Sequence, residues 1–123
     1  MERVQLEAIA RRVVESCLDG LPDDVASHAR RVAVVLRDVS LRSDHPDMAP
    51  GELLGLFSGL AYGEGEPRTP DEMPRITLFL NTLWEESGSD PEAFEEEVET
   101  TFLHELGHYL GWDEEDLEER GLD

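Results

Sequence analysis

Lysine is absent from this chain: all ten basic residues are arginine, against 30 acidic residues and a formal net charge of -20 at pH 7. Binding to nucleic acid or to an anionic membrane requires clustered basic side chains, so we expect neither partner. The acidic excess favours cationic peptides and divalent metal ions instead. A simpler interpretation is that the charge only keeps the protein dispersed in solution.

Cysteine is nearly absent as well. Cys17 is the only one, so it cannot form a disulfide within the chain, and nothing indicates an oxidising compartment. Its apolar neighbours, and the lack of a nearby activating histidine or basic cluster, predict that Cys17 fills space in the core. No apolar run is long enough for a signal peptide or a membrane span. We therefore expect a cytoplasmic protein.

The length of 123 residues predicts one globular domain, residues 1–123, with a single core and no room for a second lobe. Hydrophobic periodicity and turn residues indicate both helices and short strands, which is an α+β composition. A helix is expected over residues 2–18, ended by Gly20. The other expected elements are a short helix over 22–29, strands over 32–36, 56–61 and 75–80, a loop over 40–51 and a break at 87–89.

A long helix near the end of the sequence begins at Ser89 or at Asp90. Ser89 fits a capping box with Glu92, whereas Asp90 followed by Pro91 fits a cap with proline at the first helical position. At 100° per residue the apolar side chains fill one broad arc, which is expected to face the core. That arc contains Phe94, Val98, Phe102, Leu103, Leu106, Tyr109 and Leu110, and the opposite side carries Glu97, Thr101, His104 and His108.

The two histidines belong to the sequence H-E-x-x-H, formed by His104, Glu105 and His108. Residues four apart on a helix share a face, so both imidazoles can bind one zinc ion, with Glu105 beside them as a general base. This arrangement is typical of zinc-dependent peptidases. The competing interpretation is a surface helix that carries two histidines by chance.

The third ligand is expected shortly after the helix. Gly111 can adopt the left-handed conformation that ends a helix and lets the chain turn back toward the ion. Glu114 occupies the position of the third histidine in the metzincin motif H-E-x-x-H-x-x-G-x-x-H, and we expect it to be the ligand. Asp113 and Asp116 are neighbouring alternatives, and His45, in the 40–51 loop, is a weaker one.

Two imidazoles, one carboxylate and an open fourth position describe a catalytic zinc site, and the expected reaction is amide hydrolysis. A tetrahedral intermediate also needs a hydrogen-bond donor, for which Tyr62, Arg75 and Tyr109 are candidates. Tyr109 lies on the apolar arc, which favours a place in the core. We expect the substrate to be a flexible or unfolded peptide that pairs with an exposed strand edge.

The chain resembles the small bacterial single-domain zincin-like metallopeptidases, a minimal version of the zinc peptidase fold. The resemblance covers about residues 53–123 and rests on the segments 54–59 and 74–79, on the motif from His104 to Glu114, and on the Asp116-Leu117 pair after it. It implies a small mixed sheet with an N-terminal helix, and a zinc-binding helix packed on that sheet. The family commonly has Asp at the third-ligand position, and Glu114 is one methylene longer.

Two other functions are compatible with these residues. One is a catalytically inactive zinc-binding domain that acts as an interaction module. The other is an acidic partner-binding protein without a metal. Metal content distinguishes the acidic partner-binding protein from the peptidase. Only peptide turnover distinguishes the inactive zinc-binding domain from the peptidase.

Overall fold

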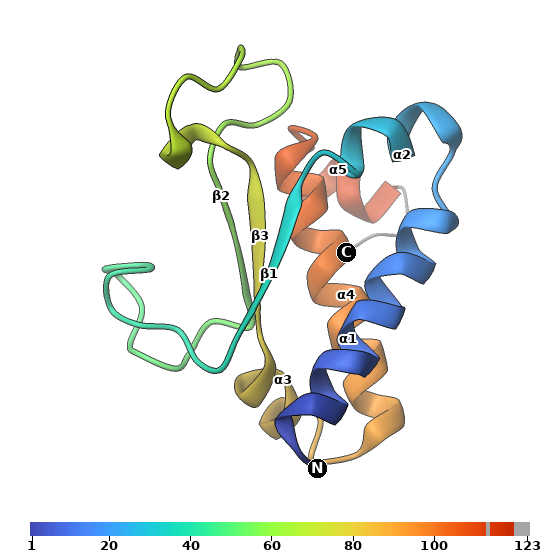
Figure 1. Cartoon of the computed structure of the whole chain (residues 1–123), viewed down its shortest axis with the longest axis vertical. Helices are drawn as coiled ribbons and strands as arrows, with labels where there is room; N and C mark the ends of the chain where they lie inside the picture. Colours follow the sequence, from blue (N-terminus) through green and yellow to red (C-terminus); the bar gives the residue numbers. More distant parts are fainter. Residues whose placement is uncertain (113, 120–123) are drawn as a thin grey trace.

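The computed structural model describes residues 1–112 and 114–119, apart from the side chains of Glu114 and Leu117. It is an α+β fold, as the sequence predicts, with an N-terminal helix, a three-stranded mixed sheet and the histidine-bearing helix near the end of the chain (Figure 1). The elements are α1 (Arg3–Asp19), α2 (Asp23–Ala29), β1 (Ala33–Arg37), β2 (Gly55–Ser58), a 3-10 turn η1 (Pro70–Glu72), β3 (Arg75–Phe79), α3 (Leu80–Glu86), α4 (Pro91–Tyr109) and α5 (Glu114–Glu119).

The sheet has the order β1-β3-β2, so β3 is central and β2 forms one edge. β1 runs parallel to β3, and β2 runs antiparallel to it. Figure 1 shows α1 and α4 together on one side of the three strands. The side chains of Ile76 and Leu78 on β3 are fully buried in the core that these helices cover. α4 contacts both β2 and β3, which brings the histidine-bearing helix next to the sheet edge.

The core joins α1, α3 and α4 to the sheet, and its members are largely those that the periodicity predicts. From α4 it takes Phe94, Val98, Phe102, Leu106 and Tyr109, while Leu103 and Leu110 pack against it partly exposed. Cys17 also packs against it, and burial raises the pKa of its thiol to about 11. The thiol is therefore neutral near pH 7, which agrees with a role as core filler.

The bounds of each of the three strands differ from the sequence prediction. The strand expected over 56–61 ends at Ser58, because Gly59 has φ of +98°, which interrupts the extended backbone. The strand expected over 75–80 ends at Phe79, and α3 begins directly at Leu80. The sequence did not predict α3, whose Leu80 and Leu83 are fully buried. The first strand is shifted by one residue, to Ala33–Arg37.

The start of α4 is at the second of the two expected positions. The Asp90 side chain accepts a hydrogen bond from the backbone N–H of Ala93, at 2.9 Å, and Pro91 is the first helical residue. Ser89 has φ of +60°, a left-handed conformation that is unlike the extended backbone of an N-cap. The capping box from Ser89 is therefore wrong, and the Asp90 cap is correct.

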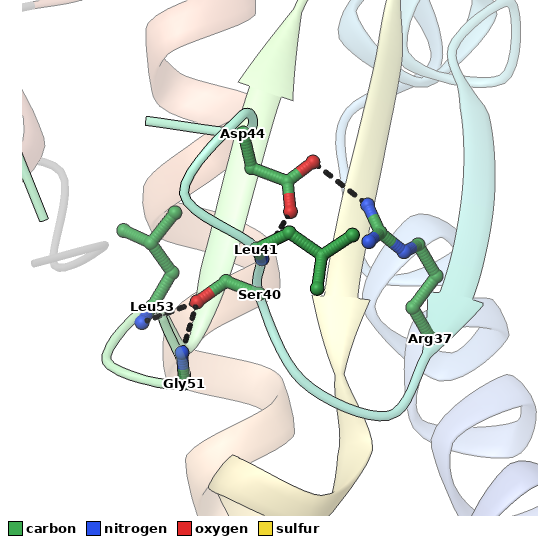
Figure 2. Close-up of polar contacts among 6 residues, drawn as sticks. All are labelled: Arg37, Ser40, Leu41, Asp44, Gly51 and Leu53. Carbon is green, nitrogen blue, oxygen red and sulfur yellow. Dashed lines mark hydrogen bonds and ion pairs between the residues drawn. The ribbon is translucent and has the colours of Figure 1, made fainter. Parts of the chain in front are cut away.

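The long loop between β1 and β2 is fastened at both ends by polar contacts (Figure 2). The buried Ser40 hydroxyl accepts hydrogen bonds from the backbone N–H groups of Gly51, at 3.0 Å, and Leu53, at 3.2 Å. Asp44 accepts from the Arg37 guanidinium at 2.8 Å and from the Leu41 N–H at 2.6 Å, and these bonds lower the pKa of its carboxyl group. The loop thus delivers the chain to the start of β2 in a defined position.

Among the described helices, none is long and apolar enough to cross a membrane.

Candidate metal centre

His104 and His108 lie one turn apart in the last two turns of α4, as the motif predicts. Their Nε2 atoms are 3.1 Å apart, and the two ring planes are nearly perpendicular, at 85°. His104 is half-buried and His108 is exposed, so neither is a core residue. The rings therefore converge on one point at the surface of the molecule.

The separation of the two nitrogens fits a shared metal ion. Zinc binds histidine nitrogen at about 2.0–2.1 Å with tetrahedral geometry, which puts two such nitrogens roughly 3.3 Å apart. The Glu105 carboxylate belongs to the same group, because ligand atoms of His104, Glu105 and His108 all lie within 4.8 Å of one another. The residues present are thus chemically suited to a divalent cation such as zinc, with borderline-soft nitrogen ligands and a nearby carboxylate.

Glu105 also contacts the sheet. Its Oε2 accepts a hydrogen bond from the backbone N–H of Phe57 on β2, at 3.0 Å. The motif gives no sign of this contact, because every residue except proline carries a backbone N–H and residue type does not reveal where it points. The carboxylate is therefore placed between the histidines and the edge strand.

The end of α4 has the glycine-dependent geometry that the sequence predicts. Gly111 has φ of +77°, its N–H donates to the His108 carbonyl at 3.1 Å, and the Trp112 N–H donates to the Gly107 carbonyl at 2.9 Å. These two bonds form a Schellman motif, which reverses the chain directly after the second histidine. α5 follows, starting at Glu114.

The third ligand stays a prediction. Asp113 and the side chain of Glu114 lie outside the described part of the chain. Asp116 is half-buried on α5. His45 is half-buried in the 40–51 loop and is not a member of the group formed by His104, Glu105 and His108.

A cleft of about 360 Å³ adjoins Glu105 and His104. One wall is α4, and the other is the end of the 40–53 loop together with the start of β2. Its described lining is mainly apolar or uncharged and consists of Met48, Glu52, Leu53, Leu54, Gly55, Thr100, Thr101, His104 and Glu105. A side chain of a bound molecule can thus reach His104 and Glu105 from this side.

Comparison with known proteins agrees with this geometry. A sequence model of the zincin-like metallopeptidase family matches residues 29–122, which include all three strands, α4 and α5. The chain belongs to this family. The match extends the resemblance recognised over residues 53–123 toward the N-terminus, to include β1. No significant match was found among curated proteins.

The three residues expected as oxyanion donors lie in three different surroundings. Tyr109 is only 6% exposed, and its ring packs edge-on against that of Phe57, with the ring centroids 5.8 Å apart. It therefore lies in an apolar environment, as its place on the apolar arc predicts. Tyr62 is exposed, and its ring contacts that of His28, with ring centroids 4.5 Å apart and the two planes tilted by 51°. Arg75 is half-buried at the start of β3. Which of them donates to an intermediate stays a prediction.

Thr101 corrects the predicted faces of α4. The helical periodicity puts it on the histidine side, yet it is buried, with 8% exposure. The reason is that Gly55 on β2 has no side chain, and a Cβ atom built there would lie 2.6 Å from Thr101 Cγ2. The strand therefore approaches α4 closely at this point, one turn before Glu105.

We expect the Gly55→Ala variant to be destabilised by about 1–3 kcal/mol, the usual cost of overpacking a tight contact. Urea unfolding measures the loss. The matched control is Gly20→Ala, because the nearest atoms to a Cβ at Gly20 are 3.6 Å away. Adding Thr101→Ala to Gly55→Ala removes the clashing methyl group and should restore part of the stability. Equal stabilities of Gly55→Ala and Gly20→Ala would contradict the expectation.

Proposed function

We propose that this protein is a zinc-dependent peptidase in which His104, His108 and Glu114 bind the metal and Glu105 is the general base. The observation that carries the proposal is the convergence of the two Nε2 atoms, 3.1 Å apart, beside the Glu105 carboxylate. Membership of the zincin-like metallopeptidase family supports it. Glu114 is included because Gly111 reverses the chain and because its spacing matches the third ligand of related motifs.

The chemistry divides between the metal and the protein. When bound, zinc lowers the pKa of a coordinated water to about 7 and polarises the scissile carbonyl group. Glu105 takes a proton from the attacking water and can pass it to the leaving amine. A Glu105 carboxylate oxygen lies within 4.8 Å of a ring nitrogen of each histidine, which is close enough for this role. His104 and His108 would bind the metal as neutral imidazoles.

The substrate that best fits the site is an extended peptide. β2 is an edge strand of only four residues, and its free edge lies beside Glu105, so a peptide can add to the sheet there through backbone hydrogen bonds. The adjoining cleft would receive one substrate side chain. Its mainly uncharged lining, with Glu52 as an acidic member, favours an apolar or a cationic side chain.

The test is zinc content together with cleavage of a mixed peptide library, each measured with and without a chelator. We expect about one zinc per chain and cleavage that the chelator abolishes and added zinc restores. Zinc binding without any cleavage would instead favour the inactive zinc-binding interaction module. Absence of bound zinc would contradict both and leave the acidic partner-binding protein as the remaining candidate.

A further inference from the structure

The hydrogen bond between Glu105 and β2 uses a group on the free edge of the sheet. In an antiparallel pair, alternate residues direct their N–H and C=O groups toward the partner strand. The Phe79 N–H donates to the Leu54 carbonyl at 3.0 Å, so Leu54 faces β3. By alternation Gly55 and Phe57 direct their backbone groups away from β3, and the contact from Phe57 to Glu105 follows this pattern.

This contact restrains a side chain that would otherwise be mobile. Glutamate has several rotatable bonds, and Glu105 is only half-buried, so its carboxylate could adopt many positions at the helix surface. A hydrogen bond to a charged acceptor is stronger than one between neutral groups. With Oε2 bonded to Phe57, the Oε1 atom stays available for proton transfer.

We propose that the backbone amide of Phe57 is a positioning group: it holds the Glu105 carboxylate in its catalytic orientation, and peptide pairing is left to Gly55 and to the Phe57 carbonyl. The proposal rests on the proposed peptidase function. It assigns two tasks to one short strand edge. The N–H at position 57 orients the base, and its neighbours along the edge bind the substrate backbone.

The contact itself can be tested without any enzymatic activity. Amide hydrogen exchange is measured by NMR in the protein incubated with zinc, for the wild type and for Glu105→Ala. We expect the Phe57 amide to exchange about 10- to 100-fold faster in the variant, as loss of a bond to a charged group implies, and the Gly55 amide to be unchanged. A Phe57 amide that exchanges equally fast in both proteins overturns the proposal.

The catalytic consequence is tested by replacing single amides with esters. Phenyllactate at position 57 removes the N–H and keeps the side chain, and glycolate at position 55 is the comparison that removes an edge N–H assigned to the substrate. Both esters weaken a carbonyl that faces β3, but only the first removes the donor to Glu105. We expect the ester at 57 to lower kcat at least about tenfold, with KM and zinc content unchanged. The ester at 55 removes an N–H that is assigned to peptide pairing, so it should raise KM while its kcat falls less than that of the ester at 57.

A wild-type kcat for the ester at 57, or an equal fall in kcat for both esters, overturns the positioning role. These results differ from a failure of the proposed function, in which the zinc-loaded wild type cleaves no peptide. In that case the exchange rates still decide whether Phe57 holds Glu105.

Discussion

Replacing Glu105 with glutamine is expected to leave zinc binding intact and to lower peptide cleavage by about 10²- to 10⁴-fold, the typical contribution of a positioned general base. The amide oxygen of glutamine can still accept the hydrogen bond from the Phe57 N–H, so the local structure is preserved. What the variant lacks is a group basic enough to take the proton. kcat and zinc content of the same preparation measure the two parts of the expectation.

The control for this variant is Glu96→Gln, which makes the same charge change at an exposed position of α4, two turns earlier. It should cleave at the wild-type rate. Unchanged cleavage by Glu105→Gln would mean that another residue is the base, or that a contaminating protease is responsible. Loss of zinc from Glu105→Gln would show that Glu105 acts mainly as a ligand.

The double variant His104→Ala, His108→Ala is expected to fall from about one zinc per chain to nearly none, because it removes two of three proposed ligands. Elemental analysis of dialysed protein measures this directly. His108 is exposed and His104 half-buried, so little packing is lost and the fold should persist, which circular dichroism can check. His28→Ala is the control, since His28 contacts Tyr62 and is not a member of the metal-capable group. Wild-type zinc content in the double variant would contradict the assignment.

Measuring zinc binding also tests which residue is the third ligand. We expect Glu114→Ala to weaken zinc binding by more than the roughly 10–100-fold that loss of an outer-shell partner costs. Glu115→Ala, at the exposed neighbouring position, should have no effect. Weakened binding in Asp113→Ala, Asp116→Ala or His45→Ala, with Glu114→Ala unchanged, would move the ligand to that residue.

The parts of the fold that sequence predicts well are those with local chemical signals. The Asp90-Pro91 cap and Gly111 mark the two ends of α4, and the spacing of His104 and His108 determines their shared face. α3 has no comparable signal. Residues 75–80 form a β-rich run that passes into it without a turn residue, and its seven residues are held by the burial of Leu80 and Leu83. Short helices depend on such tertiary packing, which a local pattern does not contain.

At the site, the sequence predicts which side chains come together but not the backbone around them. The identity of His104, Glu105 and His108 follows from the motif, and their convergence follows from helix geometry. The position of Thr101 and the hydrogen bond to Phe57 depend on how closely β2 approaches α4. That approach is set by Gly55, where the absence of a side chain has meaning only once the neighbouring element is known.

The hydrogen bonds that fasten the 40–53 loop allow the wall of the cleft to change while the histidine-bearing site keeps its position. Ser40 closes the loop onto Gly51 and Leu53, and Asp44 fastens it to Arg37, whereas the Met48 side chain makes neither of these contacts. Mutations at Met48 can therefore alter the wall of the cleft while β2, Glu105 and the histidine pair stay in place. This part of the loop can thus change in sequence without disturbing the histidine pair. Under the proposed function, it is the first segment to randomise in directed evolution of a new cleavage preference.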